Sequence, residues 1–191
     1  ANGVILITTK KGRSGKASIS FSSYYGSLTP AQLPEIQNGD QYAAFKREAF
    51  RTQGITDDLL IFNPGELQAI NNKTYTNWMD EVIKNGSVQN NEINVTGGTD
   101  KATYNMSFGA YSEKGLFKND DLKRYNGSLG ATIKLYDNLK IGANIIYTHK
   151  DNNRRLDPLN QANKIYPFGK PYDDNGNIVL YPVLGQTFAI S

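Results

Sequence analysis

Cysteine is absent from this 191-residue sequence, and histidine and tryptophan occur once each. The lack of cysteine excludes disulfides, thiol nucleophiles and cysteine-based metal sites. The longest apolar run, residues 4–7, is far shorter than the ~20 residues that a membrane-spanning helix requires. A formal net charge of +3, with acids and bases mixed along the chain, is too small to indicate binding to nucleic acid.

Glycine and tyrosine, in contrast, are abundant, with 18 and 12 residues. Tyrosine favours β structure and the boundary between lipid and water. The mean hydropathy of −0.54 is that of a polar chain, but a transmembrane barrel alternates apolar and polar residues and reaches a similar average. The chain opens with Ala1 rather than methionine and shows no signal peptide, so we expect a processed start or one inside a longer protein.

Period-two alternation is the strongest pattern in the sequence. Tyr104, Met106 and Phe108, for example, alternate with Asn105 and Ser107. Alternation of this kind predicts an antiparallel meander, and it covers residues 17–26, 89–97, 102–112, 122–135 and 139–150. An earlier run, 4–9, is apolar without alternation and predicts a strand covered on both faces, followed by a linker over 10–16.

A long polar segment separates the first alternating strand from the others. Residues 41–50 have apolar side chains near helical spacing, and Asp40 is a candidate N-cap. A second helix is predicted after Asn63, with Pro64 in its first turn, and a third over 76–84. The chain from residue 151 onward contains several prolines and is predicted to be loop, with a turn at 173–176.

Two features favour a transmembrane barrel over a soluble sandwich. The polar positions of the strands are mainly Asn, Ser, Gly and Thr, which suits a hydrated barrel interior. The connections also alternate between short and long, as the periplasmic and extracellular sides of bacterial barrels do. Aromatic residues near strand ends are candidates for an interfacial girdle, namely Tyr24, Tyr25, Tyr111, Phe117, Tyr125, Tyr136 and Tyr147.

The barrel interpretation assigns a direction to side chains and connections. Turns near Gly98 and Asp137 should be periplasmic, and the 28–88 segment extracellular. Five strands cannot close around a wide lumen, so we expect an open, curved sheet completed by the rest of a longer chain or by neighbouring molecules. In one strand, Leu129, Ala131, Ile133 and Leu135 should face lipid, and Ser128, Gly130, Thr132 and Lys134 should face the lumen.

Three stretches resemble one transporter family. ANGVILITTKKG (1–12) is similar to the end of the plug domain in SusC/RagA-type TonB-dependent outer-membrane transporters. The stretch from TNWMDEV to RYNGSLG (76–130) resembles their early barrel, with a Trp-acidic segment, a Gly-Gly turn and a Tyr-led strand. DQYAAFKREAF (40–50) is similar to a helix in their first external loop.

The resemblance implies that residues 1–13 are the C-terminal end of a plug and that 14–191 are the first strands and external loops of a β-barrel. It also implies a cell outer membrane of Bacteroidetes type, contact with its lipid, and uptake of oligosaccharides or peptides. A SusD-like surface lipoprotein and the TonB complex would be the partners. Coupling to TonB would use parts of the protein absent from these residues.

Candidate chemical sites are sparse, and we expect no enzyme activity, cofactor or metal. His149, at a strand end, has no metal or catalytic partner in sequence, and Asp173-x-Asn175-Gly176 favours a turn over a calcium loop because no bidentate Glu follows. GRSGK (12–16) lacks P-loop spacing. Seven carboxylates of the polar segment could pair for glycosidic chemistry but are expected on a solvated surface: Glu35, Glu48, Asp57, Asp58, Glu66, Asp80 and Glu81.

Aromatic side chains in the predicted external loops are the remaining candidates for ligand contact. Aromatic faces stack on sugars or peptides, but packing of the loops explains them equally well. No substrate-binding residue is therefore assigned, and a soluble all-β carbohydrate-binding or adhesin-like module stays open as the alternative function. The candidates are Tyr42, Phe45, Phe50, Phe62, Tyr75, Trp78, Tyr166, Phe168, Tyr172 and Tyr181.

Overall fold

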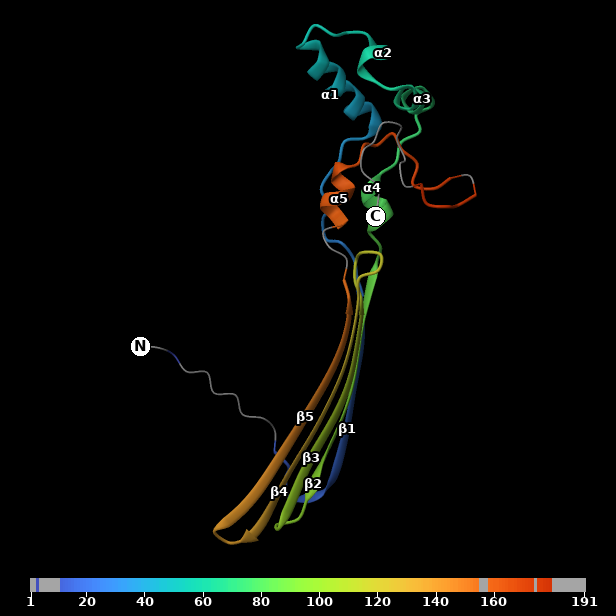
Figure 1. The fold of residues 1–191 in the computed structure, drawn as a ribbon. Coiled ribbons are helices and arrows are strands. Elements are labelled where there is room, and N and C mark those ends of the chain that lie inside the picture. The colour runs from blue at the N-terminus through green and yellow to red at the C-terminus, as the bar shows by residue number, and fades with distance from the viewer. Residues whose placement is uncertain (1–2, 4–10, 155–157, 174, 180–191) are drawn as a thin grey trace. The chain divides into compact units, whose positions relative to one another are not determined.

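The computed structural model describes residue 3 and residues 11–154, 158–173 and 175–179 (Figure 1). The predicted strand at 4–9 lies outside the described residues. The chain divides into two units. A sheet unit draws on residues 1–29 and 85–155, and a helical unit draws on 30–84 and 156–191.

The sheet unit is an antiparallel meander, as predicted. Its five strands lie side by side in chain order, so that β1 and β5 are the two edges of an open sheet (Figure 1). At 13 to 16 residues, each strand is longer than predicted and exceeds the ~9–11 residues that a tilted membrane-spanning strand needs. The bounds are β1 Gly15–Leu28, β2 Gly86–Gly98, β3 Ala102–Lys114, β4 Asp121–Tyr136 and β5 Leu139–Asn153.

Connection lengths alternate between the two ends of the sheet. Residues 99–101 join β2 to β3, where the Thr99 amide donates to the Ala102 carbonyl at 2.7 Å, and residues 137–138 join β4 to β5. At the opposite end, residues 29–85 join β1 to β2, and the chain continues after β5. The helical unit is therefore built from the segment that joins β1 to β2 and the segment that follows β5.

The helical unit contains the three predicted helices and two that were not predicted. Helices α1 (Gly39–Arg51), α3 (Pro64–Asn72) and α4 (Trp78–Val82) confirm the sequence patterns, while α2 (Asp58–Ile61) and α5 (Pro158–Lys164) were missed. None of the helices in the described ranges has the length and apolar character needed to cross a membrane.

The predicted N-cap of α1 was wrong by two residues. Asn38 caps the helix, and its side chain accepts from the Gln41 amide while the Gln41 side chain accepts from the Asn38 amide. This reciprocal capping box satisfies two amides at once, which leaves Asp40 inside the first turn. The predicted start of α3 was correct, with Asn63 as cap and Pro64 in the first turn.

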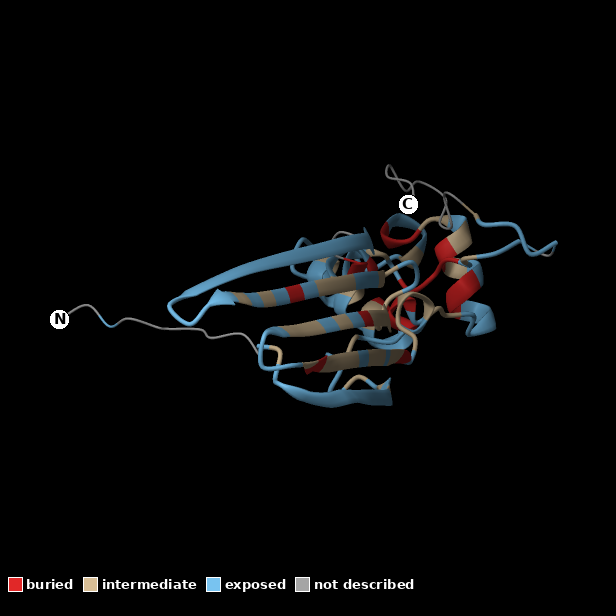
Figure 2. Ribbon diagram, turned by 90° about the horizontal axis from the view of Figure 1, so that it is seen from below, coloured by how far each residue is buried: buried red, intermediate tan, exposed pale blue. Residues whose placement is uncertain are grey.

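The buried hydrophobic residues that the structure describes all lie in the helical unit. The buried positions that Figure 2 shows on the strands are glycines. Phe168 is central among the buried hydrophobic residues, since its ring lies 5.5 Å from Tyr42, 6.3 Å from Phe62 and 6.0 Å from Tyr75 in edge-on contacts. Such aromatic pairs stabilise beyond the area they bury. The buried set is Ala43, Ile61, Phe62, Ala69, Ile70, Trp78, Met79, Ala162 and Phe168.

The segment after β5 is not simply loop, contrary to prediction. Ala162 of α5 is buried against Trp78 and Met79. The Trp78 indole donates to the Tyr166 carbonyl at 2.9 Å, and the Thr76 amide donates to the Pro167 carbonyl at 2.8 Å. Two chain segments separated by four intervening strands thus share the buried hydrophobic clusters of this unit.

Replacement of Phe168 by alanine tests this shared core. Removing a buried phenylalanine leaves a cavity and costs about 3–5 kcal/mol. In the intact protein, Phe168→Ala should therefore speed hydrogen exchange of the α1 and α3 amides. Phe45→Ala is the matched control, because Phe45 is 62% exposed and its loss should change the exchange little. Equal protection in both variants would contradict a core centred on Phe168.

Candidate functional site

One face of the sheet is apolar across all five strands in its middle rows. The register aligns successive strands so that residues opposite one another share a face. At mid-strand this gives the row Ile19, Val95, Met106, Leu129 and Ile145. These side chains have no cover in the described chain, and Ile19 and Ile145 are 68% and 63% exposed. We call this surface the apolar face. Monomeric soluble proteins rarely leave such a continuous surface uncovered.

The other face carries small polar side chains, and we call it the polar face. Ser107 and Ser128 hydrogen-bond across β3 and β4 at 2.7 Å. Next to them, the Asn105 side chain lies over Gly130, where a Cβ atom would overlap it. Glycine at this position therefore makes room for the amide of the neighbouring strand. The sequence expectation that Leu129 and Ser128 belong to opposite faces agrees with this register.

The predicted aromatic girdle is only partly on one face. Tyr25, Tyr125 and Tyr147 share the apolar face and lie toward the end with long connections. Tyr24 and Tyr111 occupy the polar face instead, because they fall on the other phase of the alternation. Proximity to a strand end, the basis of the prediction, does not distinguish the two faces. Phe117 lies in the β3–β4 connection, and Tyr136 ends β4.

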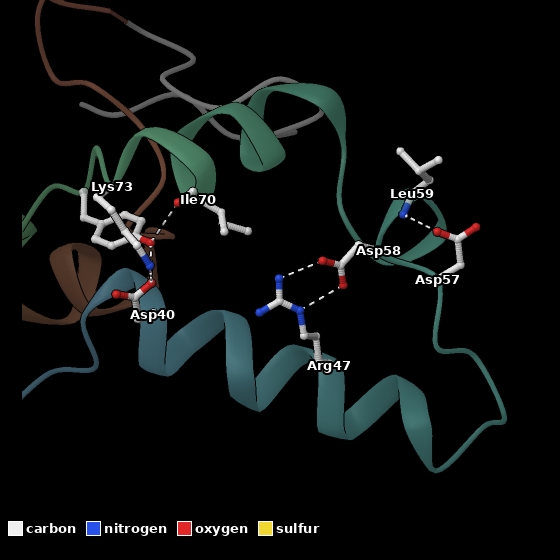
Figure 3. Close-up of polar contacts among 8 residues, drawn as sticks. Asp40, Arg47, Asp57, Asp58, Leu59, Ile70 and Lys73 are labelled. Atoms are coloured by element: carbon white, nitrogen blue, oxygen red, sulfur yellow. Dashed lines mark hydrogen bonds and ion pairs between the residues drawn. The ribbon is translucent and has the colours of Figure 1, made fainter.

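Ion pairs hold the helices of the helical unit together (Figure 3). Arg47 of α1 forms two hydrogen bonds to Asp58 of α2, at 2.9 and 2.7 Å, and this partner holds the pKa of the Asp58 carboxyl below its usual value. Asp40 accepts from the Lys73 ammonium and the Tyr75 hydroxyl, which lower its pKa in the same way. These contacts are structural, since each acid is matched by a base.

The carboxylates that the sequence analysis considered for glycosidic chemistry and expected on a solvated surface are mostly engaged in such contacts. Glu66, 3% exposed, accepts from Lys46 at 3.0 Å and completes the cap of α3. Glu48 pairs with Arg51, and Asp57 caps α2. No cluster of three or more acids or histidines suited to a metal occurs among the described residues. Glu48, Asp58 and Glu66 are each paired with a basic side chain, and this is a structural arrangement rather than the two facing carboxyl groups of a glycosidase.

Most of the candidate ligand-binding aromatics prove to be core residues. Phe62, Trp78 and Phe168 are buried. Tyr42, Phe50 and Tyr75 pack partly buried against the same core, and burial raises the pKa of Tyr42 to about 12. Phe45, Tyr166 and Tyr172 are exposed, and Tyr181 lies outside the described residues.

The remaining sequence candidates have simple structural roles. Both carboxylate oxygens of Asp173 accept hydrogen bonds from Asn175 and Asn177, which confirms the turn and leaves this carboxylate occupied within it. His149 faces Tyr125 across β4 and β5, near the end of the apolar face. In the GRSGK stretch, the Ser14 hydroxyl bonds Asp100 at 2.7 Å.

A cleft of about 470 Å³ opens beside α2 and α3. Its lining has an apolar part and three side-chain amides, and it contains no titratable group. Such a surface can bind a ligand by contact and hydrogen bonds, but it offers no group for acid–base chemistry. The lining residues are Leu59, Phe62, Pro64, Leu67, Gln68, Asn71 and Asn72.

Comparison with known proteins finds similarity to TonB-dependent receptors, in sequence and in fold. No family model matches the chain. It is 25% identical over 182 residues to the TonB-dependent receptor P26 of Formosa agariphila, an alignment covering 93% of the chain and 18% of the relative. It is 26% identical over 154 residues to the TonB-dependent receptor SusC of Bacteroides thetaiotaomicron, covering 80% and 14%.

A solved structure of the RagAB peptide transporter has the same fold, with a TM-score of 0.68 over 94% of this chain and 24% of that one, at 20% identity. The likeness to SusC/RagA-type TonB-dependent transporters is thereby confirmed. The chain spans less than a fifth of the length of the curated relatives that it matches here.

Site-directed spin labels test the two faces. In the intact protein, a label at Leu129 should be accessible to oxygen and protected from a water-soluble relaxant. A label at Ser128 should show the reverse, because successive strand residues point to opposite faces. Comparing relaxation with the two reagents measures this directly, and a label at Leu60 provides the aqueous reference. Aqueous access at both strand positions would mean that neither face meets lipid.

Proposed function

We propose that this chain is part of an outer-membrane, TonB-dependent nutrient importer, in which the sheet supplies the first five strands of the transmembrane barrel. The apolar face meets lipid, and the polar face lines the lumen. The helical unit forms the first external loop together with the segment after β5. Residues 1–13 are the end of the plug, and 14–191 belong to the barrel and its loops.

One observation carries this proposal. Five strands in register sort large apolar residues to one face and small polar residues to the other, and no described residue buries either face. In water an uncovered apolar face of this size is costly. In a membrane the same surface is favourable, while a hydrated lumen suits the serines and asparagines opposite. The likeness to TonB-dependent receptors supports the same placement.

The partners and cargo extend the proposal beyond the sheet. A SusD-like surface lipoprotein would cap the external loops, as the pairing named in the RagAB transporter suggests. The imported ligand is an oligosaccharide or a peptide. Energy arrives from TonB through parts of the protein outside this chain. The chain contributes wall and loops and performs no chemical reaction of its own.

The alternative is a soluble all-β module that binds carbohydrate. The cleft beside α2 and α3, with its amide side chains, is the observation that favours it. A soluble module needs a covered apolar face, however. The buried hydrophobic residues of the helical unit pack against one another in its own core and do not cover the sheet. Detergent dependence separates the two functions, since a soluble module stays monodisperse in plain buffer.

Introducing a charge on each face in turn tests which face contacts lipid. Arginine at a lipid-facing position near the bilayer midplane costs about 2–4 kcal/mol in barrels. Met106→Arg in the intact protein should therefore reduce the amount of heat-resistant, folded barrel in outer-membrane fractions. Ser107→Arg, on the neighbouring polar-face residue, is the matched control and should assemble nearly normally. Equal assembly of both variants would be incompatible with lipid at Met106.

Cysteine labelling tests the topology in whole cells. Leu60 in α2 is 70% exposed, and Leu60→Cys should react with a membrane-impermeant maleimide. Asn138→Cys, in the two-residue β4–β5 turn, should react only after the outer membrane is opened. Residues 1–191 contain no native cysteine that would compete for the maleimide. Labelling of residue 138 with protection of residue 60 would reverse the proposed orientation.

A further inference from the structure

One row of the polar face combines large side chains with two cations that have no acidic partner among the described residues. Most rows of this face carry serine, asparagine, threonine or glycine. Near the end with the long connections, the register instead aligns one residue from each strand into a row of larger groups. In strand order these are Tyr24, Asn90, Tyr111, Arg124 and Lys150.

Within this row, two cations stand directly opposite one another. Arg124 of β4 pairs in register with Lys150 of β5, and both side chains are exposed. Like charges in this position destabilise a sheet unless an anion lies between or beside them. Neither residue takes part in an ion pair with any other residue that the structure describes.

The acids on the same face are already bonded elsewhere. Glu113 accepts from the Tyr111 hydroxyl at 2.5 Å. Glu92, one row further along, accepts from the Asn94 side chain at 2.9 Å. Each of these carboxylates retains lone pairs, but neither lies within ion-pair distance of Arg124 or Lys150. The positive charge of the row is therefore not neutralised by its own sheet.

The guanidinium of Arg124 is also held in place. Its central carbon lies 5.1 Å from the centroid of the Tyr111 ring on the neighbouring strand. A guanidinium that stacks on an aromatic ring keeps its in-plane N–H donors available for a ligand. Those donors form a rigid fork that matches a carboxylate in two parallel hydrogen bonds.

We propose that Arg124 and Lys150, with Tyr111 as support, form a luminal subsite for a carboxylate group on the transported ligand. The inference rests on the proposed function, because the polar face must line the lumen. Uronate units of an acidic oligosaccharide and the C-terminus of a peptide both supply this chemistry. The ligand carboxylate receives two hydrogen bonds from the fork and a neighbouring positive charge.

Binding measurements on the intact, detergent-solubilised transporter test the subsite with two matched pairs of probes. One pair is trigalacturonate and its fully methyl-esterified form. The other is a pentapeptide with a free C-terminus and the same peptide amidated. The wild type should prefer the acid form of at least one pair, and the preferred pair identifies the source of the carboxylate. Absence of preference in both pairs would overturn the subsite.

Variants then assign the preference to these residues. Arg124→Gln should weaken binding of the acid probe about tenfold to a hundredfold, the range of a hydrogen bond between charged groups, and leave the neutral probe unchanged. Lys150→Gln should weaken it less. Arg124→Lys retains the charge without the fork and should fall between wild type and Arg124→Gln. Equal losses for acid and neutral probes would show a structural role for Arg124 and overturn the proposal.

Lys140→Gln is the matched control. Lys140 lies on the same face of β5 and faces Lys134 near the other end of the strand, and its replacement removes the same charge. It should not change the preference for the acid probe. A similar loss on Lys140→Gln would show that overall charge, rather than this row, attracts the ligand. Failure of the importer assignment itself would appear separately, in the whole-cell labelling of residues 60 and 138.

Discussion

The cross-strand hydrogen-bond register is the constraint on which the rest of this structure depends. Because side chains alternate along a strand, a slip of one residue between two strands would mix apolar and polar groups on both faces. The pairing of Met106 with Leu129, and of Ser107 with Ser128, keeps the faces separate. The Asn105 side chain over Gly130 supports the same register, since the amide fits only where the neighbouring strand has no Cβ. Because the faces are separate, a single sheet can have lipid on one side and water on the other.

The two units solve the problem of burial in different ways. The helical unit forms its own core around Phe168 and joins its helices by ion pairs such as Arg47–Asp58. The sheet has no comparable core, and its edge strands β1 and β5 present backbone groups that no described strand pairs. In lipid, each unpaired group would cost several kcal/mol. In the proposed barrel the sheet would therefore depend on further strands and on lipid, whereas the helical unit depends mainly on contacts within itself.

Much of the sheet could be predicted from the sequence because period-two alternation is a local signal. The faces of Leu129 and Ser128, the short turns and the open edges all follow from it. The failures concern information that is not local. α5 is only seven residues long, and its packing depends on Trp78, about eighty residues earlier. The N-cap fell on Asn38 rather than Asp40 because two capping hydrogen bonds compete successfully with one. Aromatic residues such as Phe62 looked equally suited to ligand or core until their neighbours were known.

The same short stretch of β4 and β5 has two different tasks on its two faces. Tyr125 and His149 stand opposite one another on the apolar face, and Arg124 and Lys150 stand opposite one another on the polar face, one residue away. In the proposed barrel, the first pair lies where lipid gives way to water, which suits an aromatic ring and an imidazole. The second pair then lies at the same depth inside the lumen, toward the external loops. In this barrel, a ligand entering from outside would meet these cations before the serine- and asparagine-lined stretch below. The alternation that places one face against lipid would then also set the order in which the lumen presents charge and small polar groups.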